Sequence, residues 1–194
     1  MTIKLAVLFS GGGRTVLNIL DHIDRGDLDA KVCLTIASRS DIVGIEKLIN
    51  RGFDVAVANT QDRDTAAYDK RVQAWIEDAQ PDLICLCGYL RLFQPSPWMQ
   101  GRTINIHPAL LPKFGGKGMY GINVHQAVLD QGEPISGCTV HYVDEEYDHG
   151  ATILQHTCPV HNSDTPQTLA DRVFDLECKA YPEAIKMVST LLRV

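Results

Sequence analysis

The feature that most constrains the fold is a regular alternation of apolar runs and helical repeats through residues 3–86. The segments between the runs carry apolar residues at helical spacing, as in Tyr68, Val72, Trp75 and Ile76. This alternation predicts a Rossmann-like α/β fold, an open and mostly parallel sheet with helices on both faces. The predicted strands are Ile3–Phe9, Val32–Ala37, Asp54–Ala58 and Leu83–Leu86, and the helices between them begin near Thr15, Ile42 and Tyr68.

The second half of the chain is less regular and predicts an antiparallel C-terminal portion of the sheet. Thr103–His107 predicts a fifth strand, and residues 108–122 predict a long loop because they hold prolines and glycines without periodicity. After a short helix at Val124–Leu129, the segments Cys138–Val143 and Ala151–Val160 alternate as strands. We expect these two strands to pair antiparallel across an acidic turn.

The last segment, Thr165–Leu192, predicts a long amphipathic helix with Ser163 or Asp164 as its N-cap. Pro182 is expected to kink or interrupt this helix, because proline has no backbone N–H to donate. The sequence contains no internal repeat and no linker, so we expect a single domain over residues 1–194.

Composition excludes several classes of protein. With 45% hydrophobic and 22% charged residues, the chain is neither disordered nor a coiled coil. The 18 basic and 24 acidic residues give a formal net charge of −6, so we expect no nucleic-acid partner. No apolar run reaches the length of a membrane span, and no basic and apolar leader follows Met1. We therefore expect a cytoplasmic protein without a membrane partner.

The six cysteines are scattered without a C-x-x-C pair, which is a poor basis for a zinc site. We expect them to be free thiols that act as small apolar core residues. Cys85 and Cys87 are two apart and would share one face of a strand.

A glycine-rich turn, Ser10-Gly11-Gly12-Gly13-Arg14-Thr15, joins the first strand to the first helix. Glycines let the backbone approach a ligand, and a helix N-terminus offers free N–H groups, so the turn predicts a phosphate site. The dinucleotide motif is incomplete because Val16 takes the place of its last glycine. Two alternatives stay open: an NADP site in which Arg39 contacts the 2′-phosphate, and a tight turn without a ligand.

Asn105 and His107 lie at the carboxyl end of the fifth predicted strand and point to the same side of the sheet. An amide and an imidazole at that edge can hold a developing oxyanion. Asp148, in the acidic turn, would favour the imidazolium and raise the pKa of His107 if the fold brought it alongside. A metal site made of His141, Asp148 and His149 is an alternative whose spacing matches no known metal motif.

The stretch Asn105-x-His107-Pro-x-Leu-Leu-Pro-Lys113-Phe, together with Asp148 and Ser10-Gly11-x-Gly13, resembles the phosphoribosylglycinamide formyltransferases of the folate-dependent formyltransferase family. The resemblance extends from Leu5 to about Tyr181. It implies transfer of a formyl group from 10-formyltetrahydrofolate to the amine of phosphoribosylglycinamide in purine biosynthesis, without a metal. Residues to about 100 would then form the phosphate-binding half, and residues from about 101 the folate-binding and catalytic half.

The same resemblance implies a role for each matching residue. Asn105 and His107 would stabilise the oxyanion, and Asp148 would keep His107 charged and help to remove the amine proton. Thr139 and His141 would be structural neighbours. The acceptor substrate would contact Gly12, Gly13, Arg14, Thr15 and Glu177, and the folate would contact Leu90, Arg91, Leu92, Phe93, Asn105, Asp144 and Tyr147.

The sequence departs from the family pattern at three places and leaves some questions open. The glycine-rich turn has Gly12, Arg14 and Thr15 where the best-known members have Asn, Ser and Asn. Thr65 takes the position of a family arginine that contacts folate, with Arg63 two residues earlier. The Gly115–Gly121 segment is longer than in some members, and its glycines would suit a lid over the folate. A different amine acceptor, hydrolysis of 10-formyltetrahydrofolate and a non-enzymatic NADP-binding module are the alternative functions. A monomer and a homodimer both fit the sequence.

Overall fold

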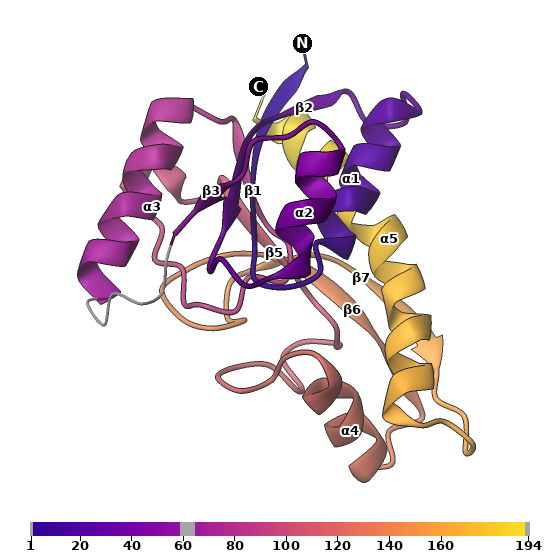
Figure 1. Ribbon diagram of the computed structural model, residues 1–194. Coiled ribbons are helices and arrows are strands. Elements are labelled where there is room, and N and C mark those ends of the chain that lie inside the picture. Colours follow the sequence, from indigo (N-terminus) through magenta and orange to yellow (C-terminus); the bar gives the residue numbers. More distant parts are fainter. Residues whose placement is uncertain (1, 59–64, 193–194) are drawn as a thin grey trace.

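The computed structural model describes residues 2–58 and 65–192 and contains a seven-stranded sheet with helices on both faces (Figure 1). The strands are β1 (Ile3–Phe9), β2 (Ala30–Ala37), β3 (Ala56–Val57), β4 (Leu83–Leu86), β5 (Thr103–His107), β6 (Ile135–Tyr142) and β7 (Thr152–Pro159). The helices are α1 (Arg14–Asp24), α2 (Val43–Asn50), α3 (Thr65–Ala79), α4 (Ile122–Asp130) and α5 (Pro166–Leu191), with a 3₁₀ turn at Pro97–Met99.

The strand order is β3-β2-β1-β4-β5-β6-β7, and the pairs from β3 to β5 are parallel. β6 pairs antiparallel with both β5 and β7. The predicted mostly parallel sheet with an antiparallel C-terminal portion is therefore confirmed. After β1 the chain moves outward in one direction to β2 and β3, and later in the other direction from β4 to β5. Open α/β sheets bind ligands at such a switch point, here between β1 and β4.

Each face of the sheet has its own apolar core. On one face α1, α2, α4 and α5 bury residues such as Val16, Leu48 and Val173, and on the other α3 buries Tyr68 and Ile76. In α3 the fully buried positions repeat every four residues, as its periodicity predicts. Each such side chain contributes about 1.5–3 kcal/mol of transfer free energy, which fixes the helices against the sheet.

Some expected boundaries and burial classes were wrong. The strand predicted over Asp54–Ala58 shortens to two residues, because it pairs only with Ile36 and Ala37 at the sheet edge. Of the six cysteines, which are all free, Cys33 is exposed and Cys178 is partly exposed, so these two are not core residues. Cys85 and Cys87 are both buried, as expected.

The N-cap of α5 is Thr165 rather than Ser163 or Asp164. The Thr165 hydroxyl accepts a hydrogen bond from the backbone N–H of Thr168, and the Thr168 hydroxyl lies 3.0 Å from the Thr165 backbone nitrogen, which completes a capping box. Asp164 instead accepts two hydrogen bonds from the Arg172 guanidinium, at 2.7 and 2.8 Å.

Pro182 lies inside α5, but the helix runs through it without interruption. Proline removes the N–H that would bond the carbonyl four residues earlier, which is that of Cys178. The side-chain amide of Asn18 in α1 donates to this Cys178 carbonyl at 2.9 Å. A neighbouring helix thus replaces the missing backbone donor, and the expected break does not occur.

We expect Asn18→Leu to lower the free energy of unfolding by about 1–3 kcal/mol, because it leaves the Cys178 carbonyl without a donor. Urea denaturation measures the change, and Asn50→Leu, at an exposed asparagine at the end of α2, is the matched control. In a Pro182→Ala background the backbone N–H of residue 182 can take over, so the cost of Asn18→Leu should shrink. An equal cost in both backgrounds would contradict this account.

Candidate functional site

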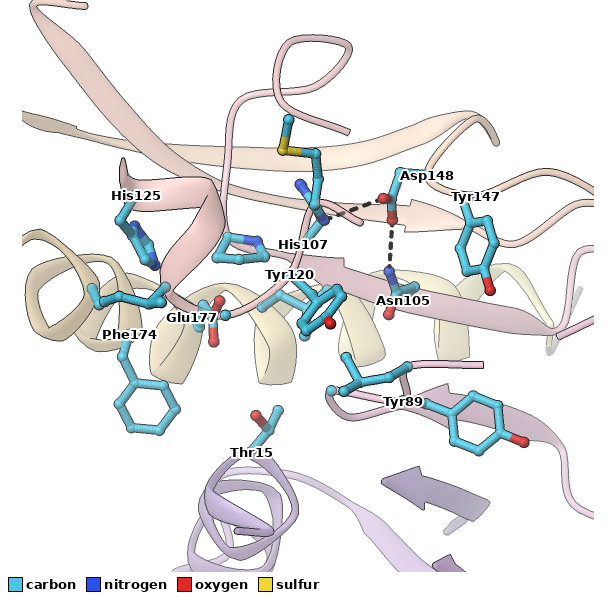
Figure 2. A pocket seen from close by; sticks show the side chains of 18 of the residues that line it. Thr15, Tyr89, Asn105, His107, Tyr120, His125, Tyr147, Asp148, Phe174 and Glu177 are labelled. Atoms are coloured by element: carbon cyan, nitrogen blue, oxygen red, sulfur yellow. Dashed lines mark hydrogen bonds and ion pairs between the residues drawn. The ribbon is translucent and has the colours of Figure 1, made fainter. Parts of the chain in front are cut away.

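A cavity of about 650 Å³ opens at the carboxyl ends of β1, β4 and β5, at the switch point of the sheet (Figure 2). Its walls also include the loop before α4, the start of α4 and one stripe of α5. Among the residues predicted for the site, it collects Arg14, Thr15, Leu90 and Glu177 with the Asn105, His107, Tyr147 and Asp148 group.

The glycine turn forms one end of this cavity. Gly13 caps α1 with a φ of 70°, a left-handed conformation that favours glycine, and no side chain caps the helix. A Cβ on Gly44 would lie 2.6 Å from the Gly11 carbonyl oxygen, so only glycine lets α2 approach the turn this closely. Arg14 and Thr15 line the cavity, while Gly12 and Gly13 form the turn that precedes them.

Arg14 is the first residue of α1, where a cation is disfavoured by the positive end of the helix dipole. Its guanidinium stacks 3.6 Å above the ring of Phe174 in α5. The positive side chain and the uncapped helix end face the same cavity, which makes this end of it a site for an anion.

Glu177 lies one turn beyond Phe174 on the same stripe of α5 and is half-buried in the cavity wall. Burial raises the pKa of its carboxyl to about 7, and the nearby charge of Arg14 opposes this rise. The residue is therefore no ordinary exposed helix glutamate.

Asn105, His107 and Asp148 meet at the other end of the cavity (Figure 2). His107 Nδ1 lies 3.4 Å from Asp148 Oδ2, and the Asn105 amide nitrogen lies 3.4 Å from Asp148 Oδ1. His107 Nε2 lies 2.7 Å from the Phe114 carbonyl oxygen, so this nitrogen carries a hydrogen and donates it. The three residues that the sequence singled out therefore lie together.

The expectation that Asp148 raises the pKa of His107 was wrong in its net result. His107 is only 3% exposed, and burial lowers its pKa more than Asp148 and the Phe114 carbonyl raise it. The carboxylate acts in the expected direction, but desolvation of the imidazolium outweighs it in the ligand-free protein.

Asp148 is held in an unusual backbone conformation with a φ of +55°, which is rare for a residue with a side chain. Burial alone would raise the pKa of its carboxyl, but contacts with His141 and His107 and the Gly116 N–H lower it overall. The Gly116 N–H donates to Asp148 Oδ2 at 2.9 Å. Gly150 allows the tight return into β7, because a Cβ there would lie 1.9 Å from the Tyr142 carbonyl oxygen.

His141 is part of this cluster, a position that the sequence analysis treated as a structural neighbour. It pairs with Asn105 across β5 and β6, and its Nε2 lies 3.1 Å from the Asn105 amide nitrogen and 3.6 Å from Asp148 Oδ1. Alternation along the strand is the sequence signal that places it on this face. His149 lies elsewhere and pairs with Asp144 at 2.8 Å, so it does not join His141 and Asp148.

The loop after β4 lies between the cavity and a smaller neighbouring hollow. Leu90 lines the cavity, and its backbone N–H donates to the Ser10 hydroxyl at 2.9 Å, which ties this loop to the glycine turn. The Arg91 guanidinium stacks 3.8 Å above the Tyr68 ring. Arg91, Leu92, Phe93 and Tyr147 line the smaller hollow beside Asn105 and Asp148.

Some residues that were expected to contact the folate do not line either hollow, and others lie outside the described residues. Asp144 lines neither hollow; its carboxylate accepts from the Glu146 N–H at 2.9 Å. Thr65 begins α3, and Arg63 lies outside the described residues. In the Gly115–Gly121 segment, Gly116, Gly118 and Gly121 have positive φ angles, and most of the segment lines the cavity.

Among the cavity residues that the sequence analysis missed are Tyr89, Tyr120, His125 and Phe174. Phe174 had a usable signal, because Gln167, Ala170, Phe174 and Glu177 repeat at helical spacing along one stripe of α5. Tyr120 lies in an irregular loop, where no periodicity indicates which side chains face inward, and His125 follows it in the short helix α4.

Two features are absent from the part of the chain that the structure describes. Across residues 2–58 and 65–192, no three His, Cys, Asp or Glu side chains are grouped so that they would hold a metal ion. Over the same ranges, no helix has both the length and the apolar character that crossing a membrane requires.

We expect the ligand-free protein to lose stability as the pH rises from about 4.5 to about 7, because the folded chain keeps the Glu177 proton over that range while the unfolded chain releases it. Glu177→Gln mimics the protonated form. Its free energy of unfolding relative to the parent should rise by about 2–3 kcal/mol from pH 5 to pH 8. Urea denaturation at both values tests this, with Glu77→Gln on the exposed face of α3 as the control. A gain that is the same at both pH values would refute the assignment.

The comparisons with known proteins agree with this geometry. The family described as Formyl transferase matches residues 3–185. The chain is 40% identical over 188 residues to "Phosphoribosylglycinamide formyltransferase, chloroplastic" of Arabidopsis thaliana, which covers 94% of the chain and 64% of that relative. It is 34% identical over 191 residues to "Trifunctional purine biosynthetic protein adenosine-3" of Bos taurus, which covers 96% of the chain and 18% of that relative.

A solved structure supports the same assignment. The crystal structure of phosphoribosylglycinamide formyltransferase from Brucella melitensis is 32% identical, with a TM-score of 0.86 over 97% of this chain and 96% of that one. The chain thus spans less than two thirds of the two relatives above, but nearly all of this structure. Since the family match covers nearly the whole described sheet and both ends of the cavity, the chain belongs to the formyl transferase family.

Proposed function

We propose that this protein transfers the formyl group of 10-formyltetrahydrofolate to the amine of phosphoribosylglycinamide, a step of purine biosynthesis. The observation that carries the proposal is a single cavity with an anion site at one end and the Asn105, His107 and Asp148 cluster at the other. The names of the similar proteins support the choice of substrates.

At the anion end, the substrate phosphate would bind to the N-terminus of α1. Backbone groups of the Gly12–Thr15 turn and the Arg14 guanidinium supply the positive side, and the stack on Phe174 holds that guanidinium in place. Glu177, farther along the wall, would contact the glycinamide part of the acceptor. The folate would lie against Leu90, Arg91, Leu92 and Phe93, with its pterin ring near Asn105 and Tyr147.

At the other end, the acceptor amine would attack the formyl carbon, forming a C–N bond while the carbonyl oxygen becomes an oxyanion. Asn105 and protonated His107 would donate hydrogen bonds to that oxygen. In the ligand-free protein these donors face Asp148, so the oxyanion would compete with the carboxylate for them. The developing negative charge would raise the pKa of His107 and offset the effect of burial.

The intermediate would collapse when the bond between the formyl carbon and the folate N10 breaks. The attacking amine loses a proton, which Asp148 would accept directly or through water, and N10 gains one from His107. The low pKa of Asp148 keeps it ionised and ready to accept that proton at neutral pH. No metal is required by this sequence of steps.

We further propose that residues 1–194 work as one formyltransferase domain, with the phosphate site in about the first 100 residues and the catalytic groups in the remainder. The proposed location is the cytoplasm, and the proposed partners are the two small-molecule substrates. A monomer and a homodimer both remain compatible with the proposal.

We expect the purified protein to form formylglycinamide ribonucleotide only when phosphoribosylglycinamide is present. Asp148→Asn and His107→Ala should each lower kcat by about 100-fold or more, since both remove a group that acts on a proton in the reaction. Asp24→Asn, at an exposed carboxylate paired with Arg51, is the control and should keep full activity. Formate release that is independent of every amine tested would instead favour a hydrolase.

We expect Arg14→Leu to raise the KM for phosphoribosylglycinamide by about 10-fold or more, because it removes a charge-assisted bond to phosphate. The KM for the formyl donor should stay unchanged. Arg39→Leu is the matched control, since Arg39 pairs with Asp41 and does not line the cavity. If Arg39→Leu alone weakened binding, and of NADP rather than of the acceptor, the anion site would belong to a dinucleotide.

A further inference from the structure

His125 is a buried histidine that the proposed mechanism leaves unused. It lies in the first turns of α4, is only 4% exposed and forms part of the main cavity wall. Figure 2 shows it on the same side of the cavity as Phe174 and Glu177, away from Tyr147 and Asp148. It therefore belongs to the Phe174 and Glu177 side of the cavity, away from Asp148.

The Nδ1 atom of His125 is shut off from solvent and has no hydrogen-bond partner within residues 2–58 and 65–192. A buried polar nitrogen without a partner destabilises the folded state, and native proteins keep nearly all such groups paired. The exceptions tend to occur where function requires the group. Because Nδ1 is closed to solvent, a ligand in the cavity would reach the ring at Nε2, and the unpaired Nδ1 leaves the ring without a protein anchor on that side.

The surroundings of His125 keep its ring neutral. Burial and then the neighbouring His107 lower its pKa, and Asp171 of α5 opposes them, so that the pKa of His125 is about 4. A neutral imidazole donates at one nitrogen and accepts at the other. It therefore complements a hydroxyl or an amide, which can donate and accept, better than a phosphate or a carboxylate.

The position of His125 also indicates which of the two substrates it would contact. The smaller hollow beside Tyr147, where the pterin would bind, is lined by other residues. His125 instead shares its part of the wall with Phe174 and Glu177, which frame the acceptor. A ligand group next to His125 is consequently a group of the acceptor.

We propose that His125 is a specificity-determining residue that hydrogen-bonds an uncharged polar group of the acceptor, a hydroxyl or an amide, between its phosphate and its amine. This inference rests on the proposed function, because it assumes an acceptor that spans both ends of the cavity. His125 does not exchange a proton with the substrate in this role; it positions the amine relative to the formyl carbon.

The test compares His125→Leu with His125→Gln in steady-state kinetics with phosphoribosylglycinamide and 10-formyltetrahydrofolate. Leucine removes the polar atoms, so the KM for the acceptor should rise by about 10-fold or more, with the KM for the donor changed by less than about twofold. Glutamine keeps a donor and an acceptor, so it should recover most of the loss. His161→Leu, at an exposed histidine between β7 and α5, is the matched control.

Thermal unfolding separates this role from a structural one. Without substrate, His125→Leu should be at least as stable as the parent, because it removes an unpaired buried nitrogen. The rise in Tm that phosphoribosylglycinamide causes should shrink in the same variant. A destabilised ligand-free variant with an unchanged acceptor KM, or an equal loss for both substrates, would overturn the proposal.

Failure of the inference and failure of the proposed function give different results. If the function is wrong, the parent protein itself shows neither turnover of phosphoribosylglycinamide nor a Tm shift with it. If only the role of His125 is wrong, the parent turns over the acceptor and His125→Leu does so with the same KM. Should the leucine variant fail to fold, the acceptor KM of His125→Gln against that of His125→Asn, whose shorter amide falls back from the cavity, decides the question.

Discussion

The site depends on the cost of keeping one carboxylate inside the protein. Asp148 is largely buried and ionised, and such a group is tolerated only when donors surround it. The donors are the backbone N–H of Gly116 and the Asn105 amide, and the imidazoles of His107 and His141 lie 3.4 and 3.6 Å from the carboxylate. The need to pair this charge therefore joins β5, β6, the loop before α4 and the turn before β7 into one arrangement.

The cavity also contains charged and polar groups that the ligand-free protein does not pair. Its anion end has a cation on the positive end of a helix dipole, its wall contains a carboxyl whose ionisation burial disfavours, and His125 has an unpaired nitrogen. Each of these features lowers the stability of the ligand-free chain. Together they would complement the proposed acceptor, which has an anionic end and uncharged polar groups.

Much of the fold follows from patterns within the sequence, and much of the site does not. Tyr68, Val72 and Ile76 repeat at helical spacing and are buried as that spacing requires. Asn105 and His107 share a strand face by alternation, so their proximity was predictable. The net pKa of His107 was not, because the desolvation that decides it depends on how tightly the loop at Phe114 closes over the ring. His125 was missed for a similar reason, since only the packed structure shows that its nitrogen has no partner.

The bond between Asn18 and the Cys178 carbonyl has a consequence beyond the continuity of α5. Asn18 is one helical turn past Arg14, and Cys178 is next to Glu177, so the bond joins the two helices that frame the Arg14 end of the cavity. A proline in one helix has created an anchoring point for the other, one turn from the cavity-lining Arg14. The spacing of the Arg14 guanidinium, the Phe174 ring and the Glu177 carboxyl is thereby set from behind the cavity, by residues outside its lining.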